Sequence, residues 1–254
     1  MKNFLLEIEK LNLIKDSISI LENISIKPLS NSLVALIGPN GSGKTSLLRS
    51  IAQIETYSGI VKMAGTATST FSQAQFSKII SWTPSSFQLP FSYSVLDIVL
   101  MGRFPTHNGR PQKIDIDKSL EALEQMDILD FKDRHVTTLS SGELQKTMIA
   151  QALASDAQVI LMDEPCANLD IAASMKLLKS LKSTVLQNRA VLFSIHDINL
   201  AQRFADSMIC LSKGRVVAQG LPKDLLSQEL VLEVFGTNSD WLQNKLGEDQ
   251  FVFY

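Results

Sequence analysis

One short glycine-rich segment constrains the fold of this chain more than any other part of its 254 residues. It reads Gly38-Pro39-Asn40-Gly41-Ser42-Gly43-Lys44-Thr45 and matches the eight-position P-loop pattern. An apolar run, 33–37, precedes it, and apolar residues at helical spacing follow it, which predicts a strand, a tight loop and a helix in succession. Glycines let the backbone N–H groups of such a loop turn toward phosphate oxygens, and the positive end of the helix adds to that field. The segment therefore predicts a phosphate-binding site.

Lys44 and Thr45 stand where this loop becomes the helix. We expect Lys44 to reach the β- and γ-phosphates of a nucleotide and Thr45 to place its hydroxyl on Mg²⁺. The alternative is a glycine-rich turn with an incidental lysine. The flanking strand and helix favour the nucleotide site.

Two acidic residues, Asp163 and Glu164, follow a second apolar run, 159–162. Runs this short and apolar on both faces are typical of buried parallel strands. A P-loop requires a carboxylate from a neighbouring strand for the metal shell, so we expect Asp163 to serve Mg²⁺. Glu164 would then point at the γ-phosphate, where it could polarise the attacking water as general base. Two acids that simply end a strand in solvent are the alternative.

Apolar runs alternate with helical spacing along most of the chain. A third run, 190–195, ends at His196. This alternation predicts an α/β fold with a parallel sheet that binds ligands at the carboxyl ends of its strands. Alternating isoleucines before the first buried strand predict antiparallel strands: Ile18, Ile20, Ile24 and Ile26.

The segment from about 86 to 155 has a different pattern. Its apolar residues repeat at helical spacing without an intervening strand pattern, which predicts an α-helical subdomain inserted in the sheet. Residues 238–254 carry no motif that we can interpret.

Composition and charge argue against several classes of protein. The only cysteines, Cys166 and Cys210, lack the spacing of a zinc site or a disulfide framework, so a reducing compartment fits. No run approaches the roughly eighteen apolar residues of a membrane span, and charges interrupt the amino-terminal residues where a secretory signal would be continuous. A formal net charge of -2 provides no broad basic field, so we expect no nucleic acid partner.

Taken together, these motifs resemble the ATP-binding cassette (ABC) family. Leu139-Ser140-Ser141-Gly142-Glu143-Leu144-Gln145 stands between the P-loop and Asp163 and is close to the LSGGQ signature of that family. Ser140 is a good helix N-cap, and the helix that it starts would present free N–H groups to an anion. Asn168-Leu169-Asp170 resembles the D-loop of the family, and His196 its switch histidine.

The resemblance covers roughly 3–237 and implies a P-loop NTPase core with a RecA-like parallel sheet, an antiparallel β subdomain and the helical subdomain. It implies ATP and Mg²⁺ as ligands, catalysis by Glu164, His196 and Lys44, and metal binding by Thr45 and Asp163. In the family, two cassettes form a head-to-tail homodimer in which the signature of one subunit meets the γ-phosphate on the P-loop of the other. The implied ATP-binding residues are Gly38, Pro39, Asn40, Gly41, Ser42, Gly43, Lys44, Thr45, Ser46, Ser140, Ser141, Gly142 and Asp170.

A finer resemblance lies in the stretch 94–105, SVLDIVLMGRFP. It is similar to the V-x-x-V-x-x-G-R-x-P stretch of ATPases from iron-siderophore, haem and cobalamin importers, and the element 220–236 is typical of the same group. An amphipathic helix of the subdomain explains the stretch equally well, and both can be true. The resemblance implies integral membrane permease subunits, an external substrate-binding protein, and a peripheral place on the cytoplasmic face of the inner membrane. The surface between Ser85 and Phe104, whose apolar residues include Phe87 and Phe91, would dock the permease.

The sequence departs from the family at three positions. Lys15 stands near the position of the aromatic residue that stacks on adenine, and Ser85 stands where the Q-loop glutamine is expected. Ser141 replaces the first signature glycine. Two alternatives therefore stay open: a nucleotide-binding regulator without turnover, and an ABC ATPase that works on nucleic acid. The second class usually carries coiled-coil insertions, tandem cassettes or basic arms, which are missing from this sequence.

Overall fold

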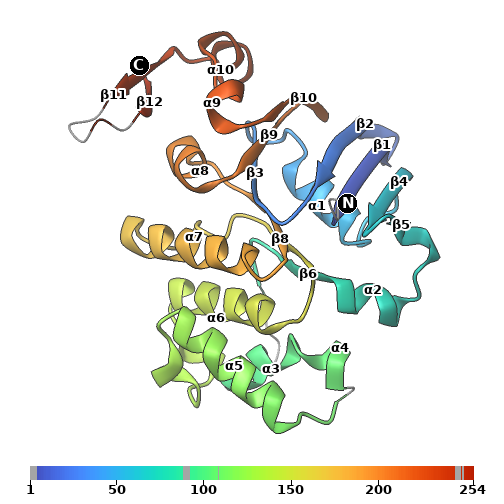
Figure 1. The fold of residues 1–254 in the computed structure, drawn as a ribbon, viewed down its shortest axis with the longest axis vertical. Coiled ribbons are helices and arrows are strands. Elements are labelled where there is room, and N and C mark those ends of the chain that lie inside the picture. The colour runs from blue at the N-terminus through green and yellow to red at the C-terminus, as the bar shows by residue number, and fades with distance from the viewer. Residues whose placement is uncertain (1–4, 88–91, 108, 244–246, 248) are drawn as a thin grey trace.

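The computed structural model describes residues 5–87, 92–107, 109–243, 247 and 249–254, and their elements form two lobes (Figure 1). One lobe contains the sheets and the helices that cover them, and the other contains a group of helices inserted between two strands. The predicted fold class, a P-loop NTPase core with an inserted helical subdomain, is confirmed.

A six-stranded sheet forms the centre of the first lobe, in the order β10-β9-β3-β8-β7-β6. All neighbours pair in parallel except the edge strand β10, which is antiparallel to β9. Strands β3, β7 and β8 are buried along their whole length because both faces of the sheet are covered. The strand bounds are β3 (Leu33–Ile37), β6 (Ile80–Thr83), β7 (Val159–Met162), β8 (Ala190–Ser194), β9 (Ser207–Ser212) and β10 (Arg215–Gly220).

A four-stranded antiparallel sheet, in the order β2-β1-β4-β5, accompanies the central sheet. The predicted alternation holds at Ile24 and Ile26, which are buried, and is wrong at Ile18, which is 64% exposed at the tip of the hairpin. Asn23, with φ of 51°, lies at an irregularity in the pairing of β1 with β2, and such an irregularity shifts the buried face along a strand. The strand bounds are β1 (Leu6–Lys15), β2 (Ile18–Leu29), β4 (Ser58–Met63) and β5 (Thr66–Ala67).

Helices surround these sheets and build the second lobe. The first lobe holds α1 (Lys44–Ile51), η1 (Thr68–Thr70), α2 (Gln73–Ile79), α7 (Ile171–Val185), α8 (Ile198–Phe204), α9 (Pro222–Leu225) and α10 (Gln228–Phe235). The second lobe, between β6 and β7, holds α3 (Val95–Met101), α4 (Phe104–His107), α5 (Lys113–Gln125), η2 (Leu129–Phe131), η3 (Val136–Thr138) and α6 (Ser141–Ala154). None of the helices among the described residues is long and apolar enough to cross a bilayer.

Gly102 and Arg103, from the 94–105 stretch, hold the helical lobe together. The Arg103 guanidinium is buried and donates to Asp115 Oδ1 and to the carbonyl oxygen of Ala154, both at 2.9 Å. It thereby ties the end of α6 to the start of α5. A Cβ on Gly102 would lie 2.1 Å from the carbonyl oxygen of Gln151, so the contact of α3 with α6 requires glycine there. These residues of the stretch therefore have a packing role.

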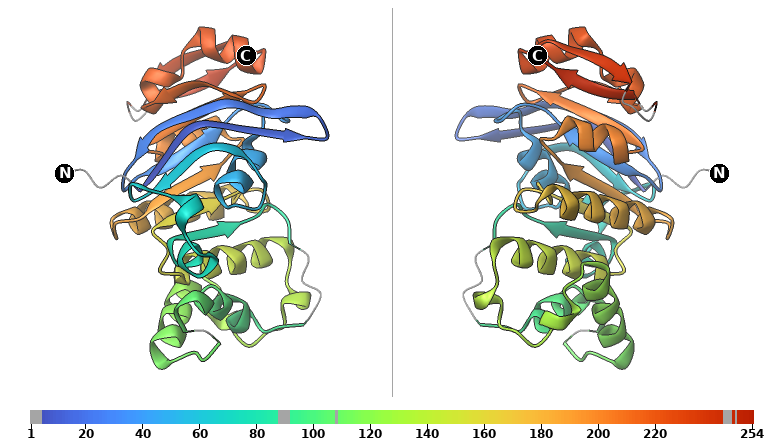
Figure 2. Two further views of the ribbon diagram at one scale, coloured as in Figure 1. Left: turned by 90° about the vertical axis from the view of Figure 1, so that its right-hand side faces the viewer. Right: turned by 90° about the vertical axis from the view of Figure 1, so that its left-hand side faces the viewer.

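The carboxyl-terminal residues form a hairpin of β11 (Ser239–Gln243) and β12 (Asp249–Phe253). Figure 2 shows it at the end of the molecule opposite the helical lobe. Phe251 is fully buried, and the Trp241 indole Nε1 donates to the carbonyl oxygen of Leu226 at 3.0 Å. The segment without a recognisable motif thus packs on the core.

Candidate active site

The carboxyl ends of β3, β7 and β8 meet at one edge of the central sheet, with β8 between the other two strands. The pairing places Leu36 of β3 beside Ser194 and Met162 of β7 beside Phe193. The residues that follow β3 and β7 are therefore brought to either side of the end of β8, which explains why motifs far apart in the sequence share one site.

The P-loop leaves β3 through a backbone that only glycine suits. Gly38 has φ of 148°, and a Cβ there would lie 2.1 Å from the carbonyl oxygen of Leu211. Lys44 is buried at the start of α1, and its Nζ donates to the carbonyl oxygens of Gly38 at 2.8 Å and Pro39 at 3.1 Å. Burial lowers the pKa of Lys44, and the carboxylates of Glu164 and Asp163 oppose that shift. The ammonium group thus lies beneath the loop, close to both acids.

The side chains of this loop suit a phosphate and a magnesium ion. The Ser42 hydroxyl is buried and has no hydrogen-bond partner within the described part of the chain, although buried hydroxyls normally have one. The Thr45 hydroxyl donates to Asp163 Oδ2 at 2.8 Å, so a hydroxyl and a carboxylate oxygen, both ligands that Mg²⁺ prefers, are adjacent. The donor set therefore fits the ion that the sequence predicts.

Glu164 and His196 form the second half of this cluster. His196 Nε2 lies 2.6 Å from Glu164 Oε1, and His196 is exposed. Glu164 has φ of 49°, a left-handed conformation that is uncommon for residues other than glycine. A carboxylate and an imidazole that face solvent next to a phosphate loop can position a water molecule and accept its proton.

Ser194 belongs to the cluster and was missed by sequence reasoning. Its hydroxyl donates to Asp163 Oδ1 at 2.7 Å and accepts from the backbone N–H of Glu164 at 2.8 Å. The available signal was a single polar residue at the end of an otherwise apolar run.

The signature and D-loop residues form a separate cluster. Ser140 caps α6 in a capping box with Glu143, whose pKa is held low by the backbone N–H and the hydroxyl of Ser140. A Cβ on Gly142 would lie 2.9 Å from the carbonyl oxygen of Asn168, so the signature glycine allows the D-loop to approach. Asp170 caps α7 by accepting from the N–H of Ala173 at 2.8 Å.

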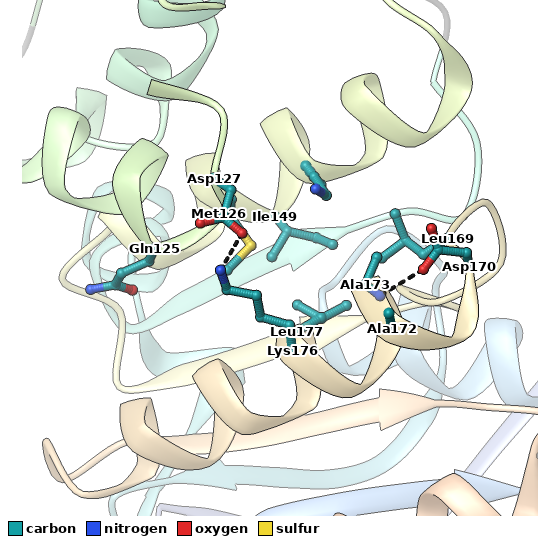
Figure 3. A pocket seen from close by; sticks show the side chains of 11 residues that line it. Gln125, Met126, Asp127, Ile149, Leu169, Asp170, Ala172, Ala173, Lys176 and Leu177 are labelled. Carbon is teal, nitrogen blue, oxygen red and sulfur yellow. Dashed lines mark hydrogen bonds and ion pairs between the residues drawn. The ribbon is translucent and has the colours of Figure 1, made fainter. Parts of the chain in front are cut away.

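This second cluster borders a groove of about 260 Å³ between α5, α6 and the start of α7 (Figure 3). Leu169 and Asp170 lie at one end of the groove, and the ion pair of Lys176 with Asp127 lies at the other. Among the described residues, no hydrogen bond joins 139–145 to the P-loop. Figure 1 shows α6 in the helical lobe, apart from α1. One chain therefore holds two half-sites that do not meet.

Two of the three departures from the family pattern, Lys15 and Ser85, lie at the end of β1 and just after β6, and the third, Ser141, is the first residue of α6. Lys15 ends β1, and its Nζ lies 2.9 Å from Glu55 Oε1, so the ammonium group is paired. Ser85 is half-buried after β6, and Phe87 packs against the main core. Leu89, Pro90 and Phe91, which the docking prediction also used, lie outside the described residues.

Comparison with known proteins matches residues 21–167 to the family model described as ABC transporter. The chain belongs to the ABC transporter family. It is 32% identical to the iron(3+)-hydroxamate import ATP-binding protein FhuC of Bacillus subtilis, over 87% of this chain and 84% of that protein. It is 31% identical to the hemin import ATP-binding protein HmuV of Rhodococcus jostii, over 85% of this chain and 75% of that protein.

A solved inward-facing structure of a metal-chelate type ABC transporter contains a chain of the same fold. Its TM-score is 0.84 at 28% identity, with 99% of this chain and 98% of that chain covered. This chain is therefore an ATPase of the ABC transporter family, as the sequence predicted, and both of these relatives, FhuC and HmuV, are import ATP-binding proteins. The match also includes the C-terminal hairpin, because almost the whole chain is covered.

Proposed function

We propose that this chain is the ATP-hydrolysing subunit of an importer for an iron-siderophore, haem or cobalamin. The observation that carries the hydrolytic role is the contact of Glu164 with His196, directly beside Asp163 and the P-loop. The substrate group follows from the names of the relatives and from the 94–105 stretch. Because the transported molecule would pass through membrane subunits, its identity does not depend on a pocket in this chain.

The chain's own residues divide the work of hydrolysis. Lys44 would exchange the carbonyl oxygens of Gly38 and Pro39 for phosphate oxygens of ATP. Thr45 and Asp163 would hold Mg²⁺, which neutralises charge on the β- and γ-phosphates. Glu164 would accept a proton from the attacking water, and His196, with Nε2 as the donor, would fix the Glu164 carboxylate.

The two half-sites require a second copy of the chain. The N terminus of α6, with Ser140, Ser141 and Gly142, would meet the γ-phosphate on the partner's P-loop, where its free N–H groups favour an anion. ATP then joins two chains, and hydrolysis removes contacts that only the closed dimer makes. Permease subunits would convert closure into transport, an external binding protein would deliver the substrate, and the chain would lie peripherally on the cytoplasmic face of the inner membrane.

The substitution Glu164→Gln tests this function. The amide keeps the size of the side chain but loses the basic oxygen, so turnover should fall by about a hundredfold or more while ATP binding persists. The variant should accumulate as an ATP-bound dimer in size-exclusion chromatography. Glu121→Gln, the same change on the exposed face of α5, is the control and should behave as wild type. Wild-type turnover by Glu164→Gln would rule out Glu164 as the general base. If the wild-type chain itself shows no turnover, the alternative of a nucleotide-binding regulator would be favoured.

A further inference from the structure

The hydroxyl of Ser194 is the one polar side-chain group of β8, whose other residues are Ala190, Val191, Leu192 and Phe193. It is fully buried at the carboxyl end of the strand that separates β3 from β7. A buried hydroxyl in such a place costs free energy unless it is hydrogen-bonded. Its partners therefore indicate what the residue does.

The two partners of Ser194 belong to the two adjacent acids. The hydroxyl donates to Asp163 Oδ1 at 2.7 Å and accepts from the N–H of Glu164 at 2.8 Å. The second carboxylate oxygen of Asp163 accepts from Thr45 at 2.8 Å. Both oxygens of Asp163 thus have hydroxyl partners, one at the end of β8 and one at the start of α1, which fixes the rotation of the carboxylate.

The bond to Glu164 acts on the backbone. Glu164 has φ of 49°, and a residue with a Cβ stays in this region only where its surroundings hold it there. The N–H of Glu164 is bonded to Ser194, and this conformation places the Glu164 carboxylate 2.6 Å from His196. Without the hydroxyl, the N–H would lose its partner and the backbone could relax.

We propose that Ser194 is a positioning residue for hydrolysis: it holds Glu164 in the left-handed conformation that brings its carboxylate to His196, and it orients Asp163 toward Thr45. The inference rests on the proposed role of Glu164. Ser194 is fully buried and bonded to Asp163 and to the backbone of Glu164, so it acts through the two acids.

Ser194→Ala removes only the hydroxyl. Loss of a group that orients a ligand or a base typically costs about ten- to a hundredfold in activity, so kcat should fall by about that factor. KM for ATP should stay within about twofold, because the P-loop contacts remain. Hydrogen exchange of the Glu164 amide, measured without nucleotide or metal, should become at least about tenfold faster as its bond is lost.

Ser119→Ala is the matched control, since Ser119 is also fully buried and its hydroxyl donates to the carbonyl oxygen of Asp115 at 2.8 Å, within α5. Both variants lose one buried hydroxyl, but only Ser194→Ala should lose turnover. In a Glu164→Gln background, Ser194→Ala should lower the residual rate by a smaller factor than in the wild-type background, because the base that it positions is already absent and only the orientation of Asp163 is still lost.

The outcomes separate this inference from the proposed function. If Glu164→Gln abolishes turnover and Ser194→Ala keeps the wild-type kcat, Ser194 has no positioning role. Equal losses of turnover in Ser194→Ala and Ser119→Ala would also overturn it, since the effect would then be one of stability. If Ser194→Ala does not fold, Ser194→Cys keeps a weakly polar group of similar size: reduced kcat at unchanged KM supports the inference, and wild-type kcat contradicts it.

Discussion

The two half-sites of this chain differ in how complete they are. At the end of the central sheet, Asp163 is bonded to Thr45, Glu164 contacts His196, and the charge of Lys44 is close to both acids, all within one chain. In the second half-site, Ser140 caps α6 of the helical lobe and Asp170 caps α7 of the first lobe, and neither makes a hydrogen bond with the P-loop within the described part of the chain. The first half-site is built by folding, whereas the second, under the proposed function, would acquire a ligand only from another molecule.

This difference shows where catalysis can be controlled. A pre-formed cluster of charges needs substrate alone, but a cluster on a separate lobe can be moved by whatever the lobe touches. Arg103 makes the lobe a unit that can move as one, because its guanidinium joins α5 to α6. Coupling to a membrane partner through that lobe is consistent with the arrangement.

Inactivating the two half-sites in different chains tests most directly whether each needs the other from a second copy. Lys44→Ala removes the phosphate contact, and Ser141→Asp, at an exposed position of α6, places a carboxylate where the partner's γ-phosphate should approach; each should lower turnover by about a hundred- to a thousandfold. A mixture of the two chains should recover about a quarter of wild-type activity, because random pairing gives half heterodimers with one intact site each. Steady-state ATPase assays of the separate and mixed chains measure this. No recovery on mixing would place the complete site in one chain.

Buried and exposed ion pairs provide a second test of the lobe as a unit. Arg103→Ala leaves Asp115 buried without its partner and should destabilise the helical lobe by about 3 kcal/mol. Arg215→Ala breaks the exposed pair with Glu22 and should cost less than about 1 kcal/mol. Denaturant unfolding measures the size of the effect, and hydrogen exchange resolves its location. Equal effects of the two substitutions would refute the role of Arg103 in tying α6 to α5.

The next largest effect is expected at the surface that would dock the permease. Phe104 is 58% exposed at the start of α4 and Met101 is 41% exposed at the end of α3, whereas Phe87 is partly packed into the core. We therefore expect Phe104→Asp to weaken binding of the permease about tenfold, as loss of an aromatic anchor does, while the chain still folds and binds ATP. Leu186→Asp is the control, because Leu186 is 85% exposed just after α7. Equal pull-down of the permease by both variants would exclude this face.

The features that could be predicted from the sequence are those that depend on short-range patterns of apolar residues. The apolar runs at 33–37, 159–162 and 190–195 became β3, β7 and β8, because strands buried on both faces must be apolar throughout. The polar and glycine-rich segments that directly follow these runs were predicted as site residues for the same reason, because they stand at strand ends. The fold class and the antiparallel strands followed from periodicity as well.

The missed features all depend on tertiary neighbours. The role of Ser194 requires knowing that β8 lies between β3 and β7, and strand order is not written in any one strand. The packing of Phe251 requires α8 and α10 to be in place, so the hairpin left no periodic signal strong enough to interpret. Arg103 was noticed as part of a family stretch, yet its buried partner Asp115 lies on another helix.

The smallest expected effect concerns the nucleotide base. Lys15 stands where the family uses an aromatic ring, and its ammonium group is paired with Glu55, which also lies 3.1 Å from the Nε of Arg49. The aliphatic stem of a lysine can cover part of a ring but offers no π face, so affinities for ATP and GTP should agree within about threefold. Lys15→Tyr should raise the affinity for ATP by about two- to tenfold, the range that ring stacking contributes beyond its buried area. Lys15→Met, which keeps an aliphatic stem and removes the ion pair, is the control and should leave the base preference unchanged. Fluorescent nucleotide titrations measure all three proteins, and a strong preference of the wild-type chain for ATP would mean that another residue reads the base.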